Sequence, residues 1–404
     1  MSAKYIITHI DGRLVSAEYD NNICVGLDIL SPTGVMGNIY AGRVENVVKN
    51  INCAFVEIEK GVKCYFPLEA DNNRHIFFNN KNNDKLNQGD SVLVQVIKEA
   101  VKTKPPTVTT KVSLTGKYVV LSSDIRGVNI SSKTKKDEMC KKVQSLLLES
   151  LNTEKFGFIV RTNCKDVNES DFEDILKEAH DMSKKFENIL QRATYEKAPV
   201  CLYKEKPLYV NHILGFPNDY IDEIITDDDN IYDTICAYLP ENERMKVRLY
   251  KDEMLELYKL YDIKKQLEQA SAQKVWLKCG GYIIIEQTEA LTSIDVNSGK
   301  CISKKSGEAA KEDTVYKVNS EAADEIARQI KLRNLSGIII IDFINMKSED
   351  NTQKLMSGLR HLFKNDKVTT TLIDITKLGL VEVTRKREGV TLLQALKDTS
   401  FKRS

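Results

Sequence analysis

The chain has 404 residues, 42% of them hydrophobic and 29% charged, a composition typical of a soluble globular protein with room for two to four domains. Its net charge is +1, so no general basic field attracts polyanions, and any nucleic-acid site must come from local clustering of basic side chains. Nine scattered cysteines without a CxxC pair favour reduced thiols in the cytoplasm over a disulfide framework or a structural zinc site, and the sequence shows neither a signal-peptide core nor a membrane-length apolar run.

The first part of the chain is predicted to be rich in short strands. Turn pairs at Asp11-Gly12 and Asn21-Asn22 divide a β meander, which ends at the break 31–34. The meander strands are expected at residues 5–10, 13–19 and 23–30. Five more strand-like runs follow before Leu121: GNIYAGRVENVV, CAFVEIE, CYFPLEA, SVLVQVIKEA and TVTTKVSL. Their spacing predicts a five-stranded barrel of the oligonucleotide-binding (OB) kind, with the polar segment 71–88 as a long loop.

Aromatic and basic residues occur together in this predicted barrel. Phe55 and Tyr65 fall on adjacent strands, and Lys98, Lys102 and Lys104 follow on the next strand and its loop. Exposed aromatic rings beside lysines suit single-stranded nucleic acid, because bases stack on the rings and the ammonium groups neutralise phosphates. The alternative is that Phe55 belongs to the barrel core and the lysines are only solvated.

The middle of the chain is predicted to mix helices and strands. Apolar spacing indicates helices over 133–151 and 169–193, and the strand FGFIVRT between them ends at Arg161-Thr162. An arginine and a hydroxyl at a strand end can bind a phosphate, although an ordinary surface terminus is the commoner case. Further on, the runs PLYVNHILGF and DEIITDD are predicted to be strands, and residues 228–239 and 252–271 helices. The acidic run 227–229 is interpreted as a turn with a helix N-cap, because no second group of ligands accompanies it.

Two apolar runs that end on aspartate stand out near the carboxyl-terminal end. They are GGYIIIEQTEALTSIDVN, which contains Asp295 and Asn297, and GIIIIDFINM, which contains Asp342. The four isoleucines of the second run predict a strand buried on both faces. A helix over 315–332 separates the runs, so a right-handed crossover places both strands in one sheet. A further helix over 350–363 and a strand over 368–375 continue the pattern.

The aspartates of these runs predict a metal site. Asn297 is two residues beyond Asp295 and therefore points to the same face of the strand. Together with Asp342 they form an oxygen-rich cluster that suits magnesium or manganese. The alternative for either aspartate alone is a turn former or a helix N-cap.

At this point the sequence resembles a known family. EQTEALTSIDVNSG, EAADEIARQIKLRNLSGIIIIDFINM and LGLVEVTRKR are similar to segments of the ribonuclease E/G family, and the similarity extends over nearly the whole chain. GNIYAGRVENVV, CAFVEI and TTKVSL resemble the S1 RNA-binding domain of that family, and FGFIVRT resembles its 5′-sensor region. The resemblance implies a cytoplasmic, magnesium-dependent endoribonuclease that cleaves single-stranded A/U-rich RNA to 5′-phosphate and 3′-hydroxyl ends, in mRNA decay and rRNA processing.

The resemblance also implies roles for individual residues. Asp295 and Asp342 would hold the metal, and Asn297 would help to position them. The residues that would bind RNA through the S1 domain are Phe55, Tyr65 (a phenylalanine in well-known members) and Lys104. The residues that would form the 5′-monophosphate pocket are Gly116, Val120, Arg161 and Thr162.

The implied fold class is a multidomain mixture of α/β and α+β structure. An RNase H-like subdomain would be split by an S1-like OB barrel and a 5′-sensor region, and a DNase I-like α/β catalytic subdomain would follow. The expected boundaries are 1–35 and 200–274 for the two RNase H-like parts, 36–121 for the barrel, 122–199 for the sensor, 275–388 for the catalytic subdomain and 389–404 for a basic tail.

The sequence departs from the family pattern in three places. No cysteine follows Cys301, so the CPxCxGxG motif that shares a zinc ion across a dimer is absent, structural zinc is not expected, and a homo-oligomer is left open. Asn345 replaces the last acid of an IDFID motif. Thr369 aligns roughly with a basic residue that supports the 5′-phosphate pocket in some members, so a weaker 5′-end preference is expected. The rival hypothesis is a non-catalytic S1-type RNA-binding or ribosome-associated protein, and a DNA nuclease is disfavoured only by the resemblance.

Overall fold

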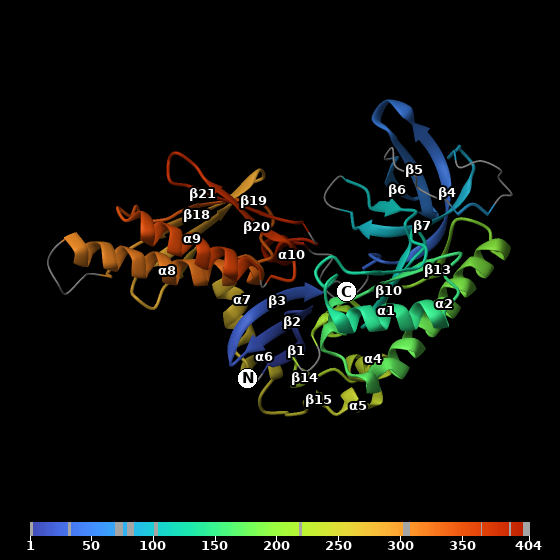
Figure 1. The fold of residues 1–404 in the computed structure, drawn as a ribbon, viewed down its shortest axis with the longest axis horizontal. Coiled ribbons are helices and arrows are strands. Elements are labelled where there is room, and N and C mark those ends of the chain that lie inside the picture. Colours follow the sequence, from blue (N-terminus) through green and yellow to red (C-terminus); the bar gives the residue numbers. More distant parts are fainter. Residues whose placement is uncertain are drawn as a thin grey trace. The chain divides into compact units, whose positions relative to one another are not determined.

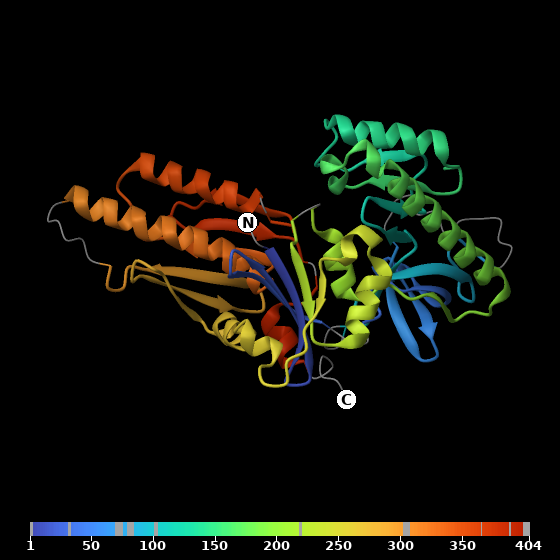
Figure 2. The same ribbon diagram turned by 90° about the horizontal axis from the view of Figure 1, so that it is seen from below.

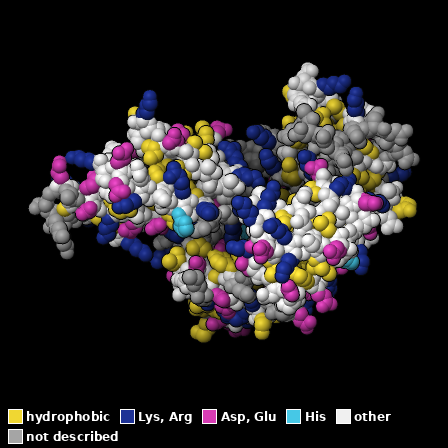
Figure 3. Space-filling model, in the orientation of Figure 1, with side chains coloured by type: hydrophobic (Ala, Val, Ile, Leu, Met, Phe, Trp, Pro, Cys, Tyr) yellow, Lys and Arg dark blue, Asp and Glu magenta, His cyan; other side chains and the backbone are white. Residues whose placement is uncertain are grey.

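A computed structural model describes nine stretches of the chain. They are residues 3–30, 34–68, 76–78, 85–100, 104–217, 220–301, 308–364, 366–387 and 389–398. The chain forms two compact units, one from Met1–Ser31 with Asp222–Ser404 and the other from Pro32–Ile221. The first unit is therefore built from both ends of the sequence, and the second is one continuous segment between them (Figure 1). Side chains of both charges are visible on the surface, and the Lys and Arg side chains gather in groups in places (Figure 3).

The first unit contains a five-stranded sheet with the order β15-β14-β1-β2-β3. Its strands are β1 (Ala3–Ile10), β2 (Arg13–Asp20), β3 (Ile23–Leu30), β14 (Glu223–Thr226) and β15 (Val247–Leu249). The predicted meander is confirmed, since Asp11, Gly12, Asn21 and Asn22 all adopt the positive φ that tight hairpins require. β14 pairs in parallel with β1, so segments more than two hundred residues apart share this sheet.

Short helices accompany this sheet. They are α4 (Asp229–Tyr238), α5 (Glu241–Arg244), α6 (Leu257–Leu260), α7 (Ile263–Ser271) and α10 (Leu392–Lys397). The N-cap interpretation of the acidic run is confirmed, because the Asp228 carboxylate accepts hydrogen bonds from the backbone amides of Asn230 and Ile231. The single helix predicted over 252–271 is wrong. Asp262 has a φ of 53°, a left-handed conformation that ends α6 and starts α7 as a separate helix.

The second sheet of this unit is six-stranded, with the order β16-β17-β18-β19-β21-β20. Its strands are β16 (Lys274–Trp276), β17 (Tyr282–Gln287), β18 (Leu291–Asn297), β19 (Gly337–Asp342), β20 (Thr370–Ile375) and β21 (Val381–Arg385). The helices α8 (Glu308–Leu332) and α9 (Glu349–Lys364) pack on one face (Figure 2). β18 and β19 are parallel neighbours joined through α8, which confirms the predicted strand–helix–strand unit.

The prediction that β19 is buried on both faces is wrong. Ile339 and Ile341 are fully buried under the helices, but Ile338 is 51% exposed. A run of identical β-branched residues cannot show which side of a strand is covered, and among the described residues α8 and α9 pack on one face only. The face that carries Asp342 is therefore the open one, where water solvates a carboxylate at little cost.

The second unit contains the predicted five-stranded barrel. Its strands are β4 (Ile39–Val48), β5 (Cys53–Glu59), β6 (Val62–Pro67), β7 (Ser91–Lys98) and β8 (Thr107–Thr109). They pair in the order β4-β5-β6-β8-β7, and the pairing of β7 with β4 closes the barrel. A strand that the sequence did not predict, β13 (Val200–Tyr203), adds to β4 from outside, and the expected boundary at residue 200 falls at its start. Most of the predicted loop 71–88 lies outside the described residues.

A four-stranded sheet with two helices completes the second unit. The strands are β9 (Ser113–Thr115), β10 (Val119–Ser122), β11 (Val128–Ile130) and β12 (Gly157–Val160), in the order β11-β12-β10-β9. The helices α1 (Glu138–Ser150) and α2 (Phe172–Tyr195) confirm the two predicted ones, with later starts, and pack against this sheet. The run TVTTKVSL, predicted as one strand, is divided between the barrel strand β8 and β9 of this sheet.

The strand predicted over 207–216 is also wrong, because this segment forms the helix α3 (Leu208–Gly215). Tyr209, Val210, Ile213 and Leu214 are all buried, and their spacing of one, three and one residues matches one face of a helix. Pro207 at the N-cap position supplies a fixed backbone angle and leaves no amide unpaired there. The aromatic and β-branched content of the run had favoured a strand, and tertiary packing overrides that preference.

Candidate active site

Asp295 and Asp342 lie directly opposite each other on neighbouring parallel strands. The register pairs them as Cα partners, which places their backbones about 5 Å apart. Ile294 and Val296 face the helices and are buried, so the intervening Asp295 points to the open face of the sheet. Asp342 is exposed on the same face, beyond the buried Ile341. The structure thus brings together the two carboxylates that the sequence predicted as neighbours.

Asn297 completes this cluster. Its side-chain Nδ2 donates a hydrogen bond of 2.7 Å to Asp295 Oδ2. The bond fixes the orientation of that carboxylate and turns the amide oxygen of Asn297 toward the same face. The predicted trio is therefore one connected group, with the asparagine directing one of the two acids.

The chemistry of this group fits a divalent cation. Neither carboxylate forms an ion pair with any described residue, and two like charges on adjacent strands repel each other. In the described part of the chain, no three His, Cys, Asp or Glu side chains are grouped so that they alone could hold a metal ion. The donor set is thus two carboxylates and an amide oxygen, which is what magnesium requires, since it keeps several waters and takes only one or two carboxylates.

The loop that follows Asp342 is held by a residue that the sequence analysis missed. Asn319 of α8 is fully buried, donates from Nδ2 to the Ile344 carbonyl at 2.7 Å, and accepts from the Ile344 amide at 3.1 Å. This two-way bond fixes the backbone two residues beyond Asp342. A signal was present in the sequence, because Asn319 is a polar residue next to Val318 on the apolar stripe of the helix. Asn345, where the family has an acid, is exposed in this loop.

Phe55 and Tyr65 are direct partners across β5 and β6 of the barrel. Their ring centroids lie 6.3 Å apart at an interplanar angle of 72°, an edge-to-face pair. Both side chains are half-buried, with the core residues Ala54, Val56 and Phe66 on the opposite side of the strands. The alternative that Phe55 is a core residue of the barrel therefore does not hold.

Two of the three predicted lysines are described near this aromatic pair. Thr107 of β8 is the partner both of Tyr65 on β6 and of Lys98 on β7, so Lys98 lies two strands from the ring. Lys104 is exposed, three residues before Thr107. Lys102 lies outside the described residues. The barrel surface thus combines half-buried aromatic rings with exposed ammonium groups.

The predicted phosphate pocket gathers around the turn between β9 and β10. Arg161 follows β12 directly, and its guanidinium donates to the carbonyls of Gly116, Lys117 and Leu214. Burial lowers the pKa of Arg161 from its usual value, yet a guanidinium stays charged in proteins. Its hydrogen-bond partners are neutral carbonyls, and the Glu178 carboxylate is a nearby opposite charge that raises the pKa of Arg161 again.

The other two residues of the predicted pocket flank this arginine. Val120 of β10 pairs with Ile159 of β12, two residues before Arg161. Thr162 is exposed and begins the short 3₁₀ helix η2 (Thr162–Asp166). Val120 thus lies on the strand next to β12, and Thr162 follows Arg161 directly, while the hydrogen bonds of the arginine go to the β9–β10 turn and to the Leu214 carbonyl.

Glu178 of α2 is a second residue that the sequence analysis missed. Its carboxylate accepts hydrogen bonds from the backbone amides of Lys117, Tyr118 and Val119 at 2.9–3.0 Å. Any Cβ at Gly116 would clash with this carboxylate, which explains the glycine. The amides of the turn are thus occupied, so a phosphate in this pocket must be bound by side chains. The sequence offered one signal for this residue, because Glu178 directly precedes Ala179, one of the buried apolar positions of α2.

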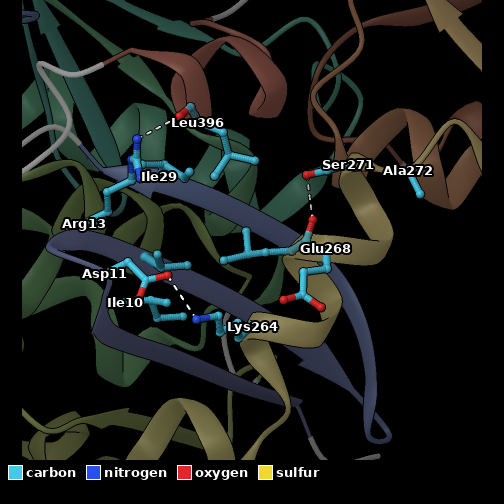
Figure 4. A pocket seen from close by; sticks show the side chains of 11 residues that line it. Ile10, Asp11, Arg13, Ile29, Lys264, Glu268, Ser271, Ala272 and Leu396 are labelled. Atoms are coloured by element: carbon cyan, nitrogen blue, oxygen red, sulfur yellow. Dashed lines mark hydrogen bonds and ion pairs between the residues drawn. The ribbon is translucent and has the colours of Figure 1, made fainter.

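The first unit has a pocket elsewhere on its surface, of about 450 Å³ (Figure 4). It lies between β1–β3, α7 and α10. Its lining residues form a Lys264–Asp11 ion pair of 3.2 Å, a hydrogen bond from Arg13 to the Leu396 carbonyl and one from the Ser271 hydroxyl to the Leu267 carbonyl. None of the residues predicted to act in a site lines it.

Comparison with known proteins shows the family of the chain. The model of the ribonuclease E/G family matches residues 113–388. Ribonuclease G of Salmonella typhimurium and of Escherichia coli K12 are each 31% identical over 394 residues, which cover 94% of this chain and 77% of the relative. Ribonuclease E of Synechocystis is 33% identical over 366 residues, covering 89% of this chain and 53% of the relative. These similarities define an endoribonuclease. The chain belongs to the ribonuclease E/G family. Within the described residues, no helix has the length and apolarity needed to cross a membrane.

Proposed function

We propose that this endoribonuclease hydrolyses single-stranded, A/U-rich RNA at the Asp295–Asp342 pair with the help of magnesium, and leaves 5′-phosphate and 3′-hydroxyl ends. The observation that carries the proposal is the direct parallel register of two exposed carboxylates without a basic partner among the described residues. Its substrates are mRNA and rRNA precursors in the cytoplasm. The family relationship supports this assignment over the rival hypothesis of a non-catalytic RNA-binding protein.

Each residue of the site has a distinct task in this proposal. Asp295 and Asp342 bind the cation, manganese being a substitute, and Asn297 keeps the Asp295 carboxylate turned toward it. Magnesium, when bound, supplies Lewis-acid stabilisation of charge on the phosphoryl oxygens and a water of lowered pKa. Asn319 keeps the backbone after Asp342 in place, so the spacing of the two acids does not change when RNA binds.

The barrel and the remaining subdomains are assigned in the same proposal. Phe55 and Tyr65 stack bases, and Lys104 contacts the RNA backbone. The five-stranded sheet that unites residues 3–30 with 223–249 supports an RNase H-like subdomain split between 1–35 and 200–274. The six-stranded sheet supports a DNase I-like catalytic subdomain over 275–388. The four-stranded sheet supports a sensor region, predicted over 122–199, although its strands β9 and β10 begin before that start.

A cleavage assay tests the proposed activity. The purified protein is incubated with a short A/U-rich RNA, with magnesium as the only divalent metal, and the product ends are identified by mass spectrometry. We expect 5′-phosphate and 3′-hydroxyl products, loss of activity with EDTA, and recovery with magnesium. DNA of the same sequence and the fully paired RNA are the controls. Products with 2′,3′-cyclic phosphate, or equal cleavage in EDTA, would contradict the proposal.

The sensor makes a separate prediction. Wild-type enzyme should cleave an RNA with a 5′-monophosphate faster than the same RNA with a 5′-hydroxyl, by a modest factor because Thr369 takes the place of a supporting basic residue. Arg161→Ala should remove the difference and leave the rate on 5′-hydroxyl RNA unchanged, since the guanidinium is the basic group of the predicted pocket. Arg161→Lys keeps a charge without the planar fork and should retain only part of the preference.

Single-turnover rates on the two RNAs provide the measurement, and circular dichroism shows whether each variant is folded. This check matters because Arg161 also bonds to the β9–β10 turn. Equal rates for both RNAs with the wild-type enzyme would show that the pocket does not sense the 5′ end.

A further inference from the structure

The open face of the six-stranded sheet carries a second group of side chains beside the two aspartates. Trp276 of β16 is 62% exposed and lies edge-to-face against Tyr282 of β17, with ring centroids 5.3 Å apart. The ammonium of Lys274 lies 4.0 Å from the Trp276 ring centroid and 3.7 Å from that of Tyr282. A cation at this distance from two rings is a close cation–π contact, which orients the Lys274 side chain.

The strand register places this group in line with the aspartates. Lys274, Ile284, Asp295 and Asp342 are successive Cα partners, so they form one row across four strands. In the adjacent row, Trp276 pairs with Tyr282 and Tyr282 pairs with Asn297. Paired residues in a sheet share a face. Lys274 therefore lies on the face of Asp295, two strands or roughly 10 Å away.

The aromatic pair does not belong to the core of the unit. The core lies on the opposite face, where Ile283 and Ile285 of β17 pack under the helices. A tryptophan exposed to this degree contributes little to folding by burial, and large exposed aromatic rings often mark binding surfaces. The two rows thus present a flat indole, an oriented ammonium and a pair of acids on a single open surface.

We propose that Lys274, Trp276 and Tyr282 form a nucleotide subsite for the RNA strand, adjacent to the scissile phosphodiester. A base stacks on the open part of the indole, and the Lys274 ammonium contacts the phosphate of that nucleotide. The occupant is single-stranded RNA, because stacking requires an unpaired base and because the subsite is continuous with the proposed cleavage site, on which it rests. The subsite holds the strand in register with Asp295 and Asp342.

The chain offers a direct probe, since Trp276 is its one tryptophan. The full-length Asp295→Asn variant, which should not cut, is titrated with an end-labelled A/U-rich RNA. Indole emission and the anisotropy of the label are recorded together. We expect the emission to be quenched along the same binding curve as the anisotropy. Saturating anisotropy with unchanged emission would overturn the proposal. This readout involves no cleavage, so its outcome is separate from that of the activity assay.

Variants of the intact enzyme give a second, kinetic test. Trp276→Ala should lower kcat/KM roughly tenfold, mainly through KM, and Trp276→Phe should restore most of the loss because it keeps a stacking ring. Lys274→Met should reduce the salt dependence of RNA binding by about one counterion, since one phosphate contact is removed. Tyr195→Ala is the matched control, an aromatic 80% exposed in the other unit, and it should have no effect. Wild-type kinetics for Trp276→Ala would contradict the subsite.

Discussion

Replacing either Asp295 or Asp342 by asparagine is expected to abolish RNA cleavage and leave RNA binding largely intact. Each change keeps the size of the side chain and removes the negative charge that a divalent cation requires. We expect cleavage to fall by about a thousandfold or more, equivalent to ~4 kcal/mol of transition-state stabilisation. Because both side chains are exposed on the open face, the substitutions should not disturb folding.

The measurement compares single-turnover cleavage with RNA affinity, the latter from anisotropy. Phe55→Ala is the informative contrast. This variant removes a ring from the barrel and should weaken RNA binding, by about 1–3 kcal/mol if the ring stacks a base, while the cleavage rate of bound RNA is unchanged.

Asn297→Asp tests the hydrogen bond that orients Asp295, since an added carboxylate repels the Asp295 carboxylate instead of donating a hydrogen bond to it. Substantial cleavage by purified Asp295→Asn or Asp342→Asn, in magnesium alone, would refute the proposed site.

A second large effect is expected on the stability of the first unit, from a substitution in a buried ion pair. Arg385 and Asp366 form a buried ion pair of 2.8 Å, with side-chain exposures of 4% and 3%. Arg385 also donates to Asn334 Oδ1 and to the Leu335 carbonyl. Arg385→Met removes the positive charge and leaves Asp366 buried without its partner. We expect a loss of about 3–5 kcal/mol in the free energy of unfolding of the first unit. Equilibrium urea denaturation provides the measurement.

A matched control comes from an exposed pair in the same unit. Lys347 and Glu308 are 81% and 87% exposed, so Lys347→Met should change stability by less than about 0.5 kcal/mol. Equal stability of the Arg385 and Lys347 variants would show that the buried pair is not a stabilising contact. In the sequence Arg385 stands in the basic segment TRKR, and the structure places it inside the fold.

The stability that the Arg385–Asp366 ion pair contributes should depend on pH. Burial by itself raises the pKa of Asp366, but the hydrogen bond and charge of Arg385, with a further hydrogen bond from Thr370, hold the pKa below its usual value. The resulting stability is fully present above the pKa that Asp366 has in the unfolded chain, about 3.9. It is lost as the pH falls through the lower pKa of Asp366 in the folded protein. In Arg385→Met the pKa of Asp366 should instead rise, so the stability gap between variant and wild type should narrow as the pH is lowered toward 4.

The sequence predicted the elements that repeat a pattern along the chain. The paired aspartates followed from two apolar runs and one crossover helix, and the barrel followed from evenly spaced short strands. Features decided by packing between distant segments were missed. The four isoleucines of β19 could not reveal which face the helices cover, and the three-residue strand of Lys274 and Trp276 is too short for periodicity to detect. Asn319 and Glu178 stand out in the sequence only as polar residues beside apolar helix positions. The backbone atoms that they bind lie 25 to 61 residues away, so no local pattern identifies those partners.

The interrupted first unit has a consequence for synthesis on the ribosome. β1 is an interior strand with the fully buried Ile6 and Ile7, yet its partner β14 begins at Glu223. At 5–20 residues per second, roughly 10–40 s separate the emergence of the two strands. During this interval the nascent β1–β3 meander has an open hydrogen-bonding edge, while the continuous segment 32–221 can already collapse as a unit. The β1–β3 meander emerges before the segment 32–221, but it is therefore among the last parts of the two units to reach its native pairing.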